Sequence, residues 1–162
     1  MNAIQNTGRR WVFAGAVFGF VAVLAGAFGA HGLKGSGKEA SGFLFEKYGT
    51  ETKIVAGHTV PAAYKYLGDF ETGARYQMYS AMALILLGLF ADRYPSKLTS
   101  VAGWCLVGGT ILFSGSLYVL VIGGSRWLGI PWGLVTPIGG TLQLAGWLSF
   151  AVAAFRRVPA TD

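Results

Sequence analysis

Five polar side chains lie inside or at the ends of apolar runs, where they are candidates for ligand binding. An arginine pairs with phosphate, and tyrosine, glutamine and histidine side chains orient a ligand through hydrogen bonds. One of them lies near the end of the stretch AGAFGAHGLK, residues 25–34, and three others are consecutive near the start of a second apolar run. The sequence therefore predicts these lipid-headgroup or ligand-binding candidates: His31, Arg75, Tyr76, Gln77 and Gln143.

Catalytic and metal-binding patterns are missing from the sequence. The chain has two histidines, His31 and His58, and one cysteine, Cys105. It contains no CxxC pair, no HExxH segment, no Walker loop and no plausible Ser/His/Asp set. We therefore expect a protein that is not an enzyme, with no catalytic residue, metal or cofactor.

The composition is typical of a membrane protein. Of the 162 residues, 53% are hydrophobic and only 12% are charged, and the mean hydropathy is +0.51. These values are too apolar for an ordinary soluble domain. The net charge of +6 is spread over the ends and connections, which favours contact with lipid headgroups and indicates no nucleic-acid partner.

Four segments are long and apolar enough to cross a bilayer, since roughly 20 helical residues span the hydrocarbon. We predict spans at about 11–33, 73–91, 98–122 and 137–155, the last beginning with Thr136 as a cap and Pro137 in the first turn. Residues 34–72 should form a cap on the membrane surface, with a short helix from about Pro61 to Leu67. The expected fold is an all-α membrane protein, a four-helix transmembrane bundle in a single domain with a surface cap on the first connection.

The first span also resembles a secretory signal. Arg9 and Arg10 precede an apolar run, and residues 25–27 read Ala-Gly-Ala, which matches a cleavage pattern. The apolar run is 23 residues long, however, and signal peptides have an apolar core of roughly 7 to 15 residues. We therefore expect a retained span, with cleavage after residue 27 as the alternative.

Small and polar residues recur every three or four positions and predict packing faces between helices. In the first span this stripe contains Gly15, Gly19, Ala22, Gly26 and Gly29, and small residues allow close contact of helices in lipid. The corresponding faces of the other spans include Ser80, Thr110, Ser114, Gly139, Gln143 and Gly146. The hydroxyl and amide groups among them should bond across helices, and Gln143 is the costliest to leave unpaired. The alternative is that Gln143 orients a ligand together with Tyr76 or Gln77.

Two charged or titratable candidates fall on outward faces. His31 is on the bulky side of the first span, at its end, and should contact headgroups or the cap. Arg75 lies opposite the small residues of the second span, so we expect its side chain to reach a lipid phosphate. Glu71, one turn earlier, is its predicted ion-pair partner.

Basic residues set the expected orientation. With four spans both termini share one side, which holds Arg9, Arg10, Arg93, Lys97, Arg156 and Arg157, against seven basic residues on the other side. The first six cluster at span ends, and Arg9 and Arg10 precede the first span, so we predict cytoplasmic termini. The family resemblance described next adds the expected compartment, the bacterial inner (cytoplasmic) membrane.

Four blocks of the chain resemble a known family. AGAFGAHGLK, FETGARYQMYSAMALILLG, GTILFSGSLYVL and TPIGGTLQLAGWLSFA are similar, in order, to the spans of the small membrane protein family that includes the bacterial inner-membrane protein YgdD and mitochondrial relatives. Ser80 stands where members commonly have a histidine. The resemblance implies a compact four-helix membrane protein and assigns no catalytic residue.

Two functions follow as hypotheses. The first is a structural or accessory subunit of a larger membrane complex, with self-association as a further form of partner. The alternative is a binder of a lipid, a quinone or another apolar small molecule. Membrane lipids are the expected surroundings in both cases.

Overall fold

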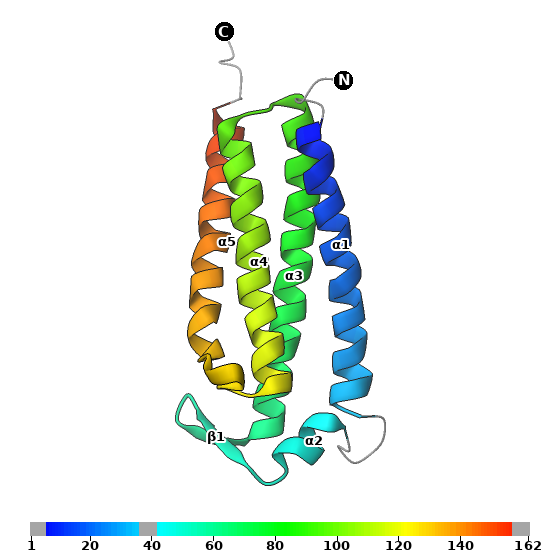
Figure 1. Ribbon diagram of the computed structural model, residues 1–162, viewed down its shortest axis with the longest axis vertical. Helices are drawn as coiled ribbons and strands as arrows, with labels where there is room; N and C mark the ends of the chain where they lie inside the picture. Colours follow the sequence, from blue (N-terminus) through cyan, green and yellow to red (C-terminus); the bar gives the residue numbers. More distant parts are fainter. Residues whose placement is uncertain (1–5, 36–41, 157–162) are drawn as a thin grey trace.

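The computed structural model describes residues 6–35 and 42–156. Four long helices are joined by shorter elements. The start of the first helix and the end of the last lie at one end of the molecule, and the cap lies at the other (Figure 1). The elements in order are α1 (Asn6–Phe28), the π-helical turn η1 (Gly29–Leu33), α2 (Phe43–Tyr48), β1 (Thr52–Val55), β2 (His58–Pro61), α3 (Ala62–Arg93), α4 (Lys97–Gly123), the 3-10 turn η2 (Trp127–Gly129) and α5 (Trp132–Phe155).

The long helices α1, α3, α4 and α5 are each long and apolar enough to cross a membrane. This confirms the predicted class of an all-α membrane protein. Their main contacts join α1 to α3, α3 to α4, and α4 to α5. The helices therefore form an open row, with α1 and α5 at its two edges (Figure 1).

Helix α3 is longer than the predicted second span. It begins at Ala62, directly after the hairpin, and continues to Arg93. The separate helix expected over Pro61–Leu67 is therefore the first part of α3, and the cap is shorter than residues 34–72. The predicted second span began only after the polar residues at the start of α3, because hydropathy detects the part of a helix that lies in the hydrocarbon. The helix itself can continue into water. Residues 36–41 of the predicted cap lie outside the described residues.

The cap seals the C-terminal end of α4. Tyr48 of α2 donates a hydrogen bond to the Val121 carbonyl at 3.2 Å, and Lys47 donates to the Ile122 carbonyl. These bonds satisfy carbonyls in the last turn of α4, which lack partners within the helix. Burial, the main cause, together with the nearby Tyr66 and Glu51, raises the pKa of the Tyr48 phenol above its usual value.

A two-stranded antiparallel hairpin completes the cap, and sequence reasoning missed it. Strands β1 and β2 pair with Val55 opposite His58. The two turn residues, Ala56 and Gly57, have φ angles of 49° and 83°. Two successive positive φ values are the geometry of a tight hairpin turn with the hand that suits twisted strands. Each strand has only four residues and is largely exposed, which explains the weak sequence signal.

Two buried apolar clusters hold the row of helices together. One lies toward the cap and includes Leu33, Leu44, Tyr66, Phe70 and Val121. The other lies toward the opposite end and includes Trp11, Leu84, Leu87, Ala102 and Leu106. Between them the buried side chains are largely polar: Gln77, Ser80, Thr110, Ser114, Ser116 and Gln143.

Glycines bring neighbouring helices into close contact, but not at every predicted position. A Cβ added to Gly15 would lie 2.6 Å from the Ala81 carbonyl oxygen of α3, as the predicted stripe requires. Gly19 has room for a Cβ at ordinary distance from Ala81, and Gly29 approaches the Phe70 ring. Gly26 is exposed, and no atom of the described residues lies within 4 Å of an added Cβ. The prediction for Gly26 was wrong because contact between α1 and α3 does not include this position.

The contact of α5 with α4 depends on two of the predicted glycines. An added Cβ would lie 2.3 Å from the Phe113 backbone nitrogen at Gly139, and 2.9 Å from the Leu106 side chain at Gly146. Helix α5 also begins five residues earlier than predicted, at Trp132, so Pro137 lies inside it. Thr136 accordingly does not cap the helix; its hydroxyl lies 2.7 Å from the Ser116 hydroxyl of α4.

Candidate functional site

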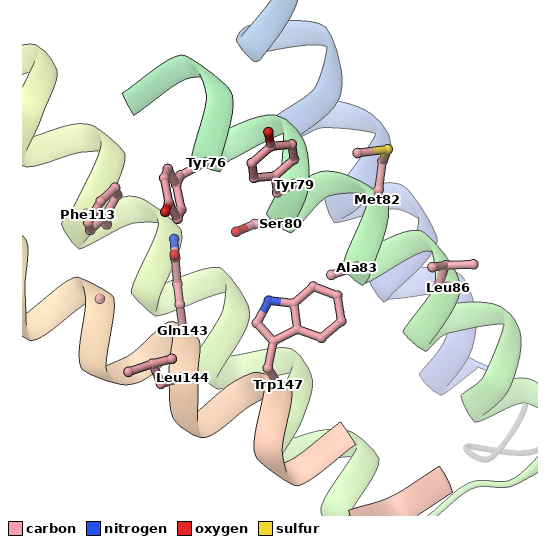
Figure 2. Close-up of a pocket in the computed structure, with 11 residues that line it drawn as sticks. Tyr76, Tyr79, Ser80, Met82, Ala83, Leu86, Phe113, Gln143, Leu144 and Trp147 are labelled. Carbon is pink, nitrogen blue, oxygen red and sulfur yellow. The ribbon is translucent and has the colours of Figure 1, made fainter. Parts of the chain in front are cut away.

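A cavity of about 700 Å³ separates α3 from α5 near the middle of the row. Helix α4 contributes Phe113 behind it, and the other lining side chains come from the two flanking helices (Figure 2). The volume lies in the range of small-molecule sites in proteins, roughly 300 to 1,000 Å³. The lining residues are Tyr76, Tyr79, Ser80, Met82, Ala83, Leu86, Phe113, Gly140, Gln143, Leu144 and Trp147.

Two buried polar residues, Ser80 and Gln143, line this cavity, and the Gln143 amide contains a donor that is unpaired within the described chain. Only 7% of Gln143 is exposed, and its Nε2 has no hydrogen-bond partner among the described residues. Its side chain extends from α5 toward Tyr76 and Ser80 (Figure 2). Because an amide NH₂ is a donor, this atom needs an acceptor that the described chain does not supply. The predicted bond from Gln143 to another helix is absent from the described part of the chain.

The placement of Gln143 follows from close packing of α5 on α4. A Cβ on Gly109 of α4 would lie 2.8 Å from both the Cγ and the backbone nitrogen of Gln143. The glycine thus lets α5 approach until the first part of the glutamine side chain is held against α4. Gln143 is also the twelfth of the 24 residues of α5, so roughly 17 Å of helix extends to either side of it.

Aromatic rings form much of the cavity wall. The Tyr76 ring lies 5.1 Å from the Phe113 ring and 5.7 Å from the Tyr79 ring, measured between centroids. Trp147 faces them from α5 (Figure 2). Tyr76 was predicted as a ligand candidate, and the structure brings it to Gln143. Tyr79 and Trp147 were missed: Tyr79 lies one turn after Arg75, on the side of the second span opposite its small residues, and no sequence pattern singles out Trp147.

Gln77 lies outside this cavity and joins three helices. Its Nε2 donates to the Phe18 carbonyl of α1 at 3.0 Å, and its Oε1 accepts from the Tyr118 hydroxyl of α4 at 3.0 Å. Both ends of the amide are therefore bonded within the protein. Of the two residues proposed to act with Gln143, the structure brings Tyr76 to it and places Gln77 in a helix contact.

The buried hydroxyl groups differ from the predicted cross-helix pattern. Thr110 donates to the Leu106 carbonyl of its own helix at 2.7 Å, which is a common way for threonine to satisfy its hydroxyl. The Ser114 Oγ is buried without a partner in residues 6–35 and 42–156. Ser80 lines the cavity instead. The pair that does join α4 to α5, Ser116 with Thr136, was missed because both residues lie close to an expected span end.

His31 and Arg75 are exposed, and neither lines the cavity. His31 lies in the π-helical turn η1 at the cap end of α1, as expected for an interface residue. Arg75 precedes Tyr79 by one turn of α3. Its predicted partner was Glu71, but the ion pair found in the described chain joins Lys65 to Asp69. In the same residues no three His, Cys, Asp or Glu side chains form a group that could hold a metal.

A family model described as "Protein of unknown function (DUF423)" matches residues 25–140. The chain belongs to the DUF423 family. The matched range of this DUF423 protein begins in the last turns of α1 and ends in α5 at Gly140, so it contains α3, α4 and most of the cavity lining. No solved structure matches the chain significantly.

Relatives of this DUF423 protein extend the similarity over nearly all of its length. It is 35% identical over 146 residues to the UPF0382 membrane protein SAB0533 of Staphylococcus aureus, with 90% of this chain and 95% of the relative covered. It is 34% identical to the UPF0382 membrane protein YwdK of Bacillus subtilis, covering 90% and 96%. A UPF0382 membrane protein of Haemophilus influenzae is 36% identical, covering 87% and 90%. These names confirm a bacterial membrane protein family and assign it no activity.

Proposed function

We propose that this protein is a non-enzymatic membrane protein that binds an apolar small molecule between α3 and α5. The observation that carries the proposal is the buried, unpartnered Nε2 of Gln143 at a cavity of about 700 Å³. A buried amide without a partner destabilises a protein by roughly 1 to 3 kcal/mol. A ligand with an acceptor group offsets that cost, and it fills space that otherwise holds lipid tails.

The rim of the cavity supports access from the bilayer. Met82, Leu86 and Leu144 line the cavity and are also exposed at the protein surface. In a membrane-spanning chain such apolar, exposed side chains face the lipid. A ligand dissolved in the bilayer therefore reaches the site laterally, without passing through the cap.

A tryptophan at the rim tests the proposal. Leu144→Trp enlarges a side chain that lines the cavity and is 72% exposed, so the protein should still fold. The wild-type protein, purified from its native membranes in mild detergent, should retain one small molecule per chain by native mass spectrometry. Leu144→Trp should reduce its occupancy at least fivefold. Leu134→Trp is the matched control, since Leu134 lies on the same helix, is 70% exposed and is outside the cavity lining.

Native mass spectrometry of the purified protein also tests the second candidate function, a structural or accessory role in a larger membrane complex. Helices α1 and α5 at the edges of the row pack chiefly on one neighbour each, and their other sides are available to another membrane protein. Co-purification of a stoichiometric protein, with no small molecule on the wild-type chain, would support the accessory role and overturn the binding function. Equal retention of the small molecule in Leu144→Trp and Leu134→Trp would also overturn it.

We also propose the bacterial inner membrane as the location, with cytoplasmic termini. Arg9, Arg10, Arg93 and Lys97 share one end of the molecule, opposite the cap, and basic residues close to span ends are enriched on the cytoplasmic side. A reporter enzyme that is active only in the cytoplasm, fused after Asp162, should be active. A periplasmic reporter at the same position should be silent, and the reverse pair of results would invert the proposed orientation.

A further inference from the structure

We propose that the molecule bound between α3 and α5 is a neutral ring compound of the quinone class, whose carbonyl oxygen accepts a hydrogen bond from Gln143 Nε2. This inference rests on the proposed function and specifies its ligand. The inference follows from the unpaired amide in the cavity, the depth of that amide in the bilayer, the absence of charge among the lining side chains and the aromatic walls of the cavity.

The depth of Gln143 excludes the polar part of an ordinary phospholipid. Gln143 lies halfway along α5, roughly 17 Å from either helix end, and half the hydrocarbon core is roughly 15 Å thick. The amide is therefore near the middle of the bilayer. Lipid ester and phosphate oxygens stay near the surface, so the acyl chains that reach this depth offer Nε2 no acceptor. The ligand must carry its acceptor into the hydrocarbon.

The charge of the lining requires that acceptor to be neutral. None of the cavity-lining side chains is charged, and Arg75 lies one turn away on the exposed surface. A carboxylate or phosphate held by Gln143 would be desolvated without a counter-charge, at a cost of several kcal/mol. A ketone oxygen has the needed lone pairs without that penalty, and a hydrogen-bonded carbonyl restores the partner that the amide lacks.

The shape and chemistry of the walls favour a flat ring. The Tyr76 ring contacts both the Tyr79 ring and the Phe113 ring, and Trp147 faces them across the cavity (Figure 2). Aromatic side chains bind a planar ring through offset or edge contacts worth roughly 0.5 to 1.5 kcal/mol beyond area burial. A hydrocarbon tail attached to the ring would leave through the exposed rim at Leu86 and Leu144.

A matched pair of probes tests the ligand class on the full-length protein in lipid nanodiscs. The probes are 2-decyl-1,4-benzoquinone and decylbenzene, which share ring size and tail but differ in the two carbonyl oxygens. The wild-type protein should bind the quinone at least tenfold more tightly than decylbenzene. Gln143→Leu should remove most of that difference by weakening quinone binding about tenfold. Thr141→Val is the control, because the Thr141 hydroxyl bonds to the Pro137 carbonyl of its own helix and lies outside the cavity.

The outcomes separate this inference from the function on which it rests. Equal affinity for both probes, or quinone binding that Gln143→Leu leaves unchanged, would overturn the ligand class. If native mass spectrometry then shows a phospholipid that Leu144→Trp releases, the binding function holds with a lipid as ligand. If neither probe binds and Leu144→Trp has no effect on retention, both proposals fail. A helical circular dichroism spectrum of Gln143→Leu shows that any loss of binding is not a loss of fold.

Discussion

Gly139→Ala should lower the free energy of unfolding by roughly 3 kcal/mol, the largest stability effect that we expect from a single methyl group in this protein. The added Cβ would lie 2.3 Å from the backbone nitrogen and 2.7 Å from the Cα of Phe113. Backbone atoms cannot rotate away as a side-chain tip does, so α5 must move from α4. Overpacking of this kind costs roughly 1 to 3 kcal/mol or more. Unfolding in a mixed micelle titrated with SDS, followed by circular dichroism, measures the change.

Gly108→Ala is the matched control for this prediction. Gly108 lies in α4, and within residues 6–35 and 42–156 no atom comes within 4 Å of an added Cβ. Alanine in a helix interior is more favourable than glycine by roughly 0.5 to 1 kcal/mol. We therefore expect a small gain in stability at Gly108 and a large loss at Gly139. Equal effects of the two substitutions would contradict the close contact between α4 and α5.

Displacement of α5 should also change the cavity, because Gln143 and Trp147 lie on the same helix as Gly139. If Gly139→Ala folds, its occupancy by the retained small molecule should fall together with its stability. Gly108→Ala should keep the wild-type occupancy.

Gln77→Leu should lower the free energy of unfolding by roughly 2 kcal/mol. The substitution removes the donor to the Phe18 carbonyl and the acceptor of the Tyr118 hydroxyl. It leaves the hydroxyl of the half-buried Tyr118 without this partner, and an unpaired buried polar group costs roughly 1 to 3 kcal/mol. Contact between α1 and α4 is slight, so the glutamine is an important link across α3. The same SDS titration provides the measurement.

The corresponding substitution Gln143→Leu should instead raise the free energy of unfolding. Gln143 is also buried, but its Nε2 has no partner in the described chain. Removing it from the ligand-free protein should raise the free energy of unfolding by roughly 1 kcal/mol. A loss of stability similar to that of Gln77→Leu would show that Gln143 is a helix contact after all, and would favour the original prediction of cross-helix bonding.

The sequence predicts the membrane spans well because hydropathy responds directly to the bilayer. Four apolar runs separated by charged segments predict four long helices, and the burial of Ser80, Thr110, Ser114 and Gln143 follows from their placement on small-residue faces. Helix ends are predicted less well. Charged residues such as Lys65 and Asp69 read as a boundary, yet they form an i,i+4 pair on the continuing helix α3.

The partners of buried groups were beyond sequence reasoning, because they depend on the order of helices in space. A helical wheel places Gly15 and Gly26 on one stripe, but it does not show which of these positions lie close to α3. It likewise places Gln77 and Gln143 on inner faces, and only the relative positions of α1, α3 and α4 show that one amide is bonded at both ends. The cavity is a property of two helices separated in sequence by a third, so no local pattern indicates it.

The open row of helices bears on how the protein is made. Each long helix packs chiefly on the one that precedes or follows it in the chain, so contacts have short sequence separation, which favours rapid assembly. During synthesis, α3 can dock on α1, then α4 on α3, without any earlier helix being displaced from its neighbours. The cavity needs α3 and α5 together, and it is therefore completed only when the last helix leaves the ribosome and enters the membrane.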